Sequence, residues 1–219
     1  MRLAFAATSH VPTEPFRSGA ELVERKMSSF REEAQGVVSL RLYESCECRK
    51  IVDSIKGLYG WDPALVRQGQ EGDNYDIVAR SDIRSASTLN TAHVEGLYDE
   101  FEQKVDSLVK PLIQRLWKLD LRDHSGTHLL KYEAADHYIP HRDTGLGFEG
   151  RYFSVVCYLN DDFTGGRTLF PTLNYAVTPE AGQAILFPSN YLHGSEPVIS
   201  GTKFVFVSWI DGPVPIRWF

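Results

Sequence analysis

The sequence predicts an α+β fold, with helices in its first half and a double-sheet jelly roll in its second half. In the first half, apolar residues recur every three or four positions, as they do on the buried face of a helix. After Gly126 the pattern changes to short apolar runs separated by turn residues, which is typical of strands. Because these strands are short and evenly punctuated, we expect two packed sheets backed by helices rather than a parallel sheet with crossover helices.

The length and composition fit one sizeable globular domain. The chain has 219 residues, of which 42% are hydrophobic and 24% charged. We expect an N-terminal extension over residues 1–36, with a weakly periodic helix around 20–31, and a single domain over residues 37–219. Within that domain, helical support occupies residues 37–125 and the jelly-roll core occupies residues 126–219.

The first predicted helix begins near Ser45, a residue type that often caps helix N-termini. Ile51, Ile55 and Leu58 then fall on one helical face, and Gly60 ends the pattern. A polar loop follows, and a short extended segment is expected over residues 75–79.

A second, longer helix is predicted from apolar residues spaced three and four apart. These residues are Val94, Leu97, Phe101, Val105, Leu108 and Leu112. Pro111 cannot donate a backbone hydrogen bond, so it marks a kink or a new first turn. This helix is expected to scaffold the core.

The second half of the chain carries the predicted strands. They span residues 127–132, 152–159, 167–170, 183–187 and 203–210. Turn residues separate them, including the Gly165-Gly166 pair. Together they form the double-stranded β-helix, or jelly roll, of the expected fold.

Charge and cysteine usage exclude several classes of partner. The net charge is -6 and the basic residues are scattered, so nucleic acid is not expected as a partner. The longest apolar runs have the length of strands, so no membrane association is expected, and the opening seven residues are too short for a signal peptide. The three cysteines form no disulfide framework, and Cys46 and Cys48 lack a second ligand pair for zinc. We therefore expect a cytoplasmic protein.

Candidate metal ligands stand out in the second half. His141 and Asp143 have the spacing that places two side chains on one face of a strand, and His193 can supply a third ligand from a neighbouring strand. Two imidazoles and one carboxylate can occupy three adjoining positions of an octahedral metal and leave three open. The pattern predicts an iron site suited to oxygen chemistry.

Lys203 is a candidate anion anchor. It begins the apolar run that continues through Phe204, Val205 and Phe206, which indicates a strand buried on both faces. An unpaired ammonium there would be costly, so a bound carboxylate is the better account. Two other classes remain open: a non-catalytic jelly-roll module that kept the metal as structure, and a zinc hydrolase with the same ligands.

The segment from Leu129 to Trp209 resembles the catalytic core of the prolyl 4-hydroxylase branch of the iron(II)- and 2-oxoglutarate-dependent dioxygenases. Many residues of this segment keep the spacing that the family's motifs have. They include Tyr132 and Tyr138 before the first histidine, Tyr158-Leu159-Asn160, the run from Gly165 to Pro171, Pro179, Gly182, Ala184 to Pro188, His193, Pro197-Val198, Gly201, Lys203 and Trp209.

The resemblance implies cofactors and their residues. Iron(II) would be bound by His141, Asp143 and His193, with dioxygen as a substrate and ascorbate as a candidate reductant. The far carboxylate of 2-oxoglutarate would be bound by four residues. These are Lys203, Tyr132, Thr168 and, as an additional hydroxyl, Tyr158. The products would be a hydroxylated substrate, succinate and carbon dioxide, and the carboxylate at Asp143 favours hydroxylation over halogenation.

Three further positions concern the substrate. Tyr138, Arg151 and Trp209 stand where peptide-acting prolyl hydroxylases line the target pocket, which favours a prolyl or proline-like substrate. The alternative is that Trp209 packs in the barrel and Arg151 is a strand-edge charge. A hydroxylase of a free amino acid or small natural product is the runner-up, with residues 143–150 and 68–84 as its selectivity elements.

Overall fold

The computed structural model describes residues 29–69, 75–89, 94–145 and 147–213. Residues 20–28 of the weak N-terminal helix expected from the sequence lie outside these ranges. Among the described residues, no helix is long and apolar enough to cross a lipid bilayer.

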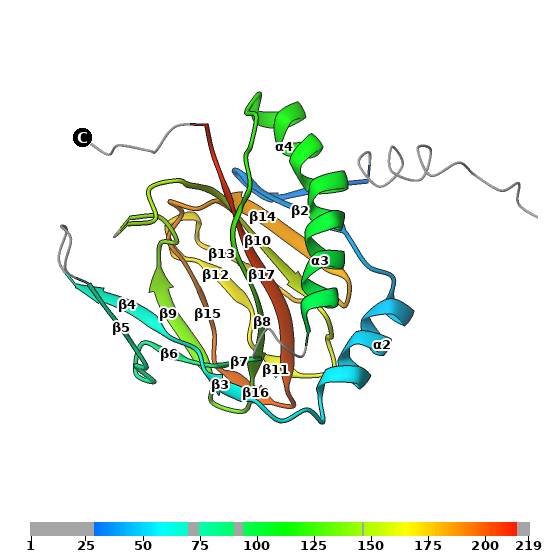
Figure 1. The fold of residues 1–219 in the computed structure, drawn as a ribbon, viewed down its shortest axis with the longest axis vertical. Coiled ribbons are helices and arrows are strands. Elements are labelled where there is room, and N and C mark those ends of the chain that lie inside the picture. Colours follow the sequence, from blue (N-terminus) through cyan, green and yellow to red (C-terminus); the bar gives the residue numbers. More distant parts are fainter. Residues whose placement is uncertain (1–28, 70–74, 90–93, 146, 214–219) are drawn as a thin grey trace, which may run out of the picture.

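Two antiparallel sheets face each other, and helices cover the outer face of the larger one (Figure 1). The eight strands of the larger sheet are, in spatial order, β1 (Arg31–Ala34), β2 (Val37–Arg41), β14 (Gln183–Pro188), β10 (Arg151–Tyr158), β17 (Lys203–Asp211), β8 (His124–Tyr132), β7 (Ser87–Leu89) and β3 (Trp61–Pro63). The five strands of the smaller sheet are β13 (Tyr175–Val177), β12 (Thr168–Phe170), β15 (His193–Ser195), β9 (His137–His141) and β6 (Arg84–Ser85). This double-sheet arrangement confirms the predicted jelly roll.

Two strand pairs lie beside these sheets. One joins β11 (Thr164–Gly165) to β16 (Val198–Ser200), and the other is the hairpin of β4 (Val66–Gly69) and β5 (Tyr75–Val78). The β4–β5 hairpin lies on the side of β9 that faces away from the helices (Figure 1). It confirms the extended segment expected near residue 75.

Aromatic contacts attach the helices to the larger sheet. The helices are α2 (Ser45–Ile55), α3 (Glu95–Lys104), the π-helical turn Val105–Val109 and α4 (Lys110–Trp117). Phe101 stacks on Phe206 with ring centroids 4.7 Å apart, and Trp117 meets Phe153 edge to face at 4.9 Å. Pro111 lies in the first turn of α4, as predicted, where its missing N–H costs little.

The predicted ends of the first helix were wrong by a few residues. Glu44, not Ser45, is the N-cap: its side chain and that of Glu47 each accept the other's backbone N–H, as in a capping box. The helix ends at Ile55, and Leu58 lies beyond it with 37% of its surface exposed. The reciprocal Glu44–Glu47 pair satisfies two N–H groups, which a serine hydroxyl alone does not.

The strands expected in the second half are present, but the first half also supplies β2 to β7. Helical support therefore describes only part of residues 37–125. The division at residue 36 falls between β1 and β2, which pair with each other. That domain boundary stays a prediction.

The two faces of strand β17 pack into different hydrophobic cores. Phe204 and Phe206 pack in the core beneath the helices, whereas Val205 packs in the core between the two sheets. Since side chains alternate along a strand, Lys203 and Trp209 share the face of Val205. Both line the cavity between the sheets.

Candidate active site

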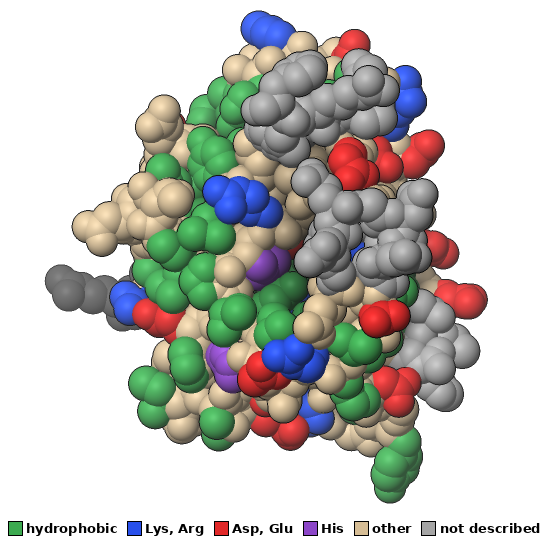
Figure 2. Space-filling model, turned by 90° about the vertical axis from the view of Figure 1, so that its left-hand side faces the viewer, with side chains coloured by type: hydrophobic (Ala, Val, Ile, Leu, Met, Phe, Trp, Pro, Cys, Tyr) green, Lys and Arg blue, Asp and Glu red, His purple; other side chains and the backbone are tan. Residues whose placement is uncertain are grey.

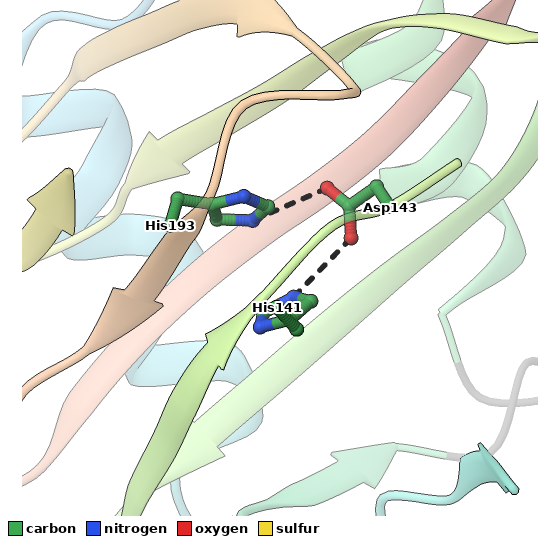
Figure 3. A group of neighbouring side chains, drawn as sticks. All are labelled: His141, Asp143 and His193. Atoms are coloured by element: carbon green, nitrogen blue, oxygen red, sulfur yellow. Dashed lines mark ion pairs between the residues drawn. The ribbon is translucent and has the colours of Figure 1, made fainter. Parts of the chain in front are cut away.

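The three predicted metal ligands come together at one point between the sheets. His141 ends β9 and His193 begins β15, and the two are register partners across this strand pair. Asp143 follows β9, where its N–H donates to the carbonyl of Ser189 at 2.9 Å. Its carboxylate lies 3.3 Å from Nε2 of each histidine, and the three ligand atoms lie within 4.8 Å of one another (Figure 3).

Hydrogen bonds orient each ligand. Nδ1 of His141 lies 2.9 Å from the Ile139 carbonyl, and Nδ1 of His193 lies 3.0 Å from the Tyr191 carbonyl. Because a carbonyl only accepts, each Nδ1 carries the proton and Nε2 is left to bind a metal. This arrangement fixes both imidazoles in the tautomer that a metal site requires.

A buried serine supports the carboxylate. Ser154 is fully buried, and its hydroxyl donates to Oδ2 of Asp143 at 2.7 Å; it also lies 2.9 Å from the hydroxyl of Ser189. Nothing in the sequence pattern indicates this role, since Ser154 is one polar residue in an apolar strand. Ser154 reaches Asp143 because β10 lies beside the loop that carries this ligand.

The electrostatics favour the metal-binding protonation states of Asp143 and His141, whereas His193 has to give up its Nε2 proton when a metal binds. Burial alone would raise the pKa of Asp143, but His193 and His141 outweigh it and hold that pKa well below its ordinary value. Burial, with a further effect of His193, lowers the pKa of His141. Burial opposes the charged form of His193 as well, yet Asp143 raises its pKa. An ionised carboxylate and imidazole nitrogens fit iron(II), which accepts mixed nitrogen and oxygen ligands.

Lys203 lies in the same cavity as the metal ligands, at its base. It is 2% exposed, and its Nζ donates to the Gly166 carbonyl at 2.7 Å and to the Ser195 hydroxyl at 3.0 Å. Burial lowers its pKa to about 7, and Glu196 offsets this only in part. A buried lysine with a pKa this low gains by binding an anion.

The predicted hydroxyl partners surround this lysine. Tyr132 and Thr168 line the cavity. Nζ of Lys203 lies 5.0 Å from the ring centroid of Tyr132 and 5.7 Å from that of Tyr158. Tyr158 itself lies behind the cavity wall, where its hydroxyl is 2.6 Å from that of Thr168. It is therefore placed to orient Thr168 rather than to face the cavity.

An outer cleft opens from the metal site toward the β4–β5 hairpin, and it brings together the three predicted substrate residues. Tyr138 stacks on His141 with centroids 3.5 Å apart. The guanidinium of Arg151 lies between two rings, 3.6 Å from the centroid of Phe148 and 3.8 Å from that of Trp209. Arg151 is 7% exposed and also donates to Ser125, so it is not a free strand-edge charge.

Residues that the sequence did not single out also line the cleft. His128 meets Trp209 edge to face at 5.4 Å. Arg84, from the two-residue strand β6, lies 4.9 Å from the ring centroid of Tyr138. Arg67, from β4, lies 3.5 Å from that of Phe148. The only signal for the arginines was the expected selectivity segment over residues 68–84, which ends at Arg84 and just misses Arg67.

The comparisons with known proteins agree with this geometry. Residues 127–211 match the 2OG-Fe(II) oxygenase superfamily. The chain is 28% identical over 198 residues to prolyl 4-hydroxylase subunit alpha-1 of Gallus gallus, covering 74% of this chain and 38% of that protein. It is 35% identical over 115 residues to a PKHD-type hydroxylase of Synechococcus sp. (strain CC9902), covering half of each. A probable prolyl 4-hydroxylase of Arabidopsis thaliana is also similar, and the chain covers 58% of its length. The chain therefore spans less than two thirds of the length of each of these three relatives.

Solved structures share the fold. A Pseudomonas putida prolyl-4-hydroxylase aligns with a TM-score of 0.59 at 20% identity, covering 87% of this chain and 97% of that one. A Trichoplax adhaerens prolyl hydroxylase, solved with a hypoxia inducible factor peptide fragment, aligns with a TM-score of 0.64 at 19% identity, covering 88% and 90%.

Residues 127–211 are therefore similar to the 2OG-Fe(II) oxygenase superfamily, and the group of His141, Asp143 and His193 fits the iron(II) that this superfamily's description names. Over part of its length the chain is also similar in sequence to prolyl 4-hydroxylases.

Proposed function

We propose that the protein is an iron(II)- and 2-oxoglutarate-dependent dioxygenase that hydroxylates an unactivated C–H bond of a prolyl or proline-like substrate, with release of succinate and carbon dioxide. One observation carries the proposal. A single cavity is lined by His141, Asp143 and His193 at one position and by Lys203 at another. A metal site and a buried cation in one cavity suit a ligand that chelates through one end and carries a carboxylate at the other.

The residues fit both groups. His141, Asp143 and His193 would bind the iron and leave open positions for 2-oxoglutarate and dioxygen. Together, iron and 2-oxoglutarate supply the oxidising chemistry that inserts one oxygen atom into a C–H bond and cleaves the co-substrate to succinate and carbon dioxide. The protein's part is to hold the ligands, orient the co-substrate and exclude water.

Lys203 would bind the far carboxylate of 2-oxoglutarate. With a pKa near 7 before binding, it would take up a proton as the carboxylate arrives, because the negative charge favours the ammonium. Thr168, oriented by Tyr158, and the phenol of Tyr132 can donate further hydrogen bonds.

The substrate part of the proposal rests on the outer cleft. Tyr138, Arg151 and Trp209 line it together, next to the metal ligands. Several relatives are prolyl 4-hydroxylases by name, which supports the same substrate class. The alternative substrate is a free amino acid or small natural product.

Mass spectrometry of candidate substrates incubated with iron(II), 2-oxoglutarate and ¹⁸O₂ tests the proposal. We expect one labelled oxygen per product and one succinate per hydroxylation with a proline-containing peptide or a free proline-like amino acid. If succinate forms only at the background rate of an Asp143→Ala variant with every candidate, hydroxylation of this class is excluded.

The setting of the reaction is also a proposal. Cys46, Cys48 and Cys157 are free thiols, which supports a reducing cytoplasm. Ascorbate is the proposed reductant, which would return iron that has been oxidised to iron(III) to the iron(II) state. A peptide or small molecule is the proposed partner, with neither nucleic acid nor membrane.

A further inference from the structure

The outer cleft is basic, although the chain as a whole is acidic. Its described lining includes Arg67, Arg84, Arg142 and Arg151, and its only carboxylate is the metal ligand Asp143. The net charge of the whole chain is -6. On the face that contains the hairpin, a basic side chain and a histidine lie among hydrophobic side chains near the middle (Figure 2). A local excess of one sign in a cleft raises the concentration of ligands of the opposite sign.

Arg84 lies where the outer cleft meets the cavity of the metal site. It lines both the cavity that holds the metal ligands and the outer cleft. Its Nε is buried without a hydrogen-bond partner, NH1 makes a long bond of 3.3 Å to the Leu65 carbonyl, and the side chain also hydrogen-bonds to Tyr132. Within the described part of the chain it makes no ion pair. A buried N–H without an acceptor costs free energy until a ligand supplies one.

Arg151 brings a second charge to the same place. It lies between two rings and is held by weak bonds of 3.3 and 3.4 Å to Ser125. Burial first, and then Arg84 and Arg151, lower the pKa of His128 to about 4, which places both arginines near that ring. Both arginines also lower the pKa of Tyr138, against the larger effect of burial. Tyr138 stacks on the metal ligand His141. Both arginines line the outer cleft together with the metal ligands His141 and Asp143.

We propose that the cleft selects a substrate with a carboxylate next to the prolyl or proline-like ring, and that Arg84, together with Arg151, binds this carboxylate. The inference rests on the proposed function and adds the charge of the substrate to it. The carboxylate can come from an aspartate or glutamate beside the proline in a peptide, or from the α-carboxyl group of a free proline-like amino acid. Guanidinium groups bind a carboxylate through paired, charge-assisted hydrogen bonds in either case.

The test compares matched acidic and neutral substrates. One arm uses peptides in which glutamate or glutamine stands beside the proline, and the other uses free L-proline and L-prolinamide. The measured quantity is kcat/KM from succinate formation and product mass. We expect an acidic member of one arm to exceed its neutral match by about 10- to 100-fold, which is the range for a charge-assisted hydrogen bond. The arm that shows the preference identifies the source of the carboxylate.

Two variants test whether the cleft causes the preference for acidic substrates. Arg84→Gln should remove most of the acidic-over-neutral ratio. Lys56→Gln, which removes the same charge from an exposed side chain on the helix side of the molecule, should keep it. Raising the salt concentration should weaken the preference only modestly, because a partly buried pair is screened less than an exposed one.

Two results would overturn the inference. One is equal turnover of acidic and neutral members. The other is hydroxylation of no acidic member by protein that forms the iron–2-oxoglutarate chelate. Failure of the proposed function is distinguishable from both, because in that case the chelate itself does not form.

Discussion

The base of the cavity, around Lys203, and its mouth, which is the outer cleft, are built differently. At the base, Lys203 is 2% exposed and held by Gly166 and Ser195. At the mouth, Arg84 and Arg151 lie against aromatic rings and face an open cleft. The base is narrow and polar only where one carboxylate would bind. The mouth has room and several charges.

The difference separates what the chemistry needs from what the substrate needs. The base is built from β8, β12 and β17, which belong to the strand-rich second half that matches the superfamily. Much of the mouth is built from β4 and β6 of the first half, outside the matched region. We infer that the base serves the shared co-substrate and that the mouth sets specificity.

Loss of a metal ligand should give the largest effect. Asp143→Ala removes the carboxylate that lies between His141 and His193, so 2-oxoglutarate turnover should fall to background and iron binding should weaken strongly. Iron content and succinate formation measure this. His137→Ala, on the same strand but outside the ligand group, is the control and should bind iron normally.

Loss of the anchor at the base should come next. Lys203→Ala should raise KM for 2-oxoglutarate about 100-fold, since truncating one partner of a buried charge pair costs roughly 2–5 kcal/mol. Lys131→Ala, on the neighbouring strand β8 but paired with Glu133, should leave that KM unchanged. An unaltered KM in Lys203→Ala would show that the carboxylate binds elsewhere.

The pKa of Lys203 predicts a pH dependence. The protonated amine binds the carboxylate, and its pKa before binding is about 7. As the pH rises above 7, less of the free enzyme is protonated, so KM for 2-oxoglutarate should rise by up to about tenfold per pH unit. Below pH 7 this contribution should be constant. Lys203→Arg should flatten the profile, because a guanidinium keeps its charge.

The mouth should give the smallest single effect. Trp209→Phe keeps an aromatic ring but reduces the surface stacked on Arg151, so KM for the organic substrate should rise by about three- to tenfold, within the range of a cation–π contact. Trp117→Phe, which alters a tryptophan on the helix side, is the matched control. A larger effect on 2-oxoglutarate than on the substrate would contradict the assignment of Trp209 to the mouth.

The sequence predicted which residues would come together in one cavity, namely the candidate metal ligands and Lys203. His141 and Asp143 are only two residues apart, so they stay close although Asp143 lies just beyond the end of β9, and the alternation along residues 203–209 places Lys203 and Trp209 on one face. Arg84 was not predicted as a site residue, because its two-residue strand has no periodicity and its neighbours come from distant segments. Ser154 was not predicted as a site residue because its hydrogen bond to Asp143 joins a strand to a loop, and no local sequence pattern indicates such a contact.

The same limit applies to the fold. Apart from β5, which was expected as an extended segment, strands β2 to β7 are short and several are polar, so the sequence showed no clear alternation there. They become strands through pairing with distant partners, such as β2 with β14. Tertiary pairing outweighs local propensity in such segments.

We propose that one cavity holds iron and 2-oxoglutarate together. Anaerobic addition of iron(II) and then 2-oxoglutarate to the wild-type protein tests it most directly, by visible absorption. We predict the weak charge-transfer band of the chelate, its loss in Asp143→Ala, and its appearance only at higher 2-oxoglutarate concentration in Lys203→Ala. Absence of the band in iron-loaded wild-type protein at saturating 2-oxoglutarate would contradict the account.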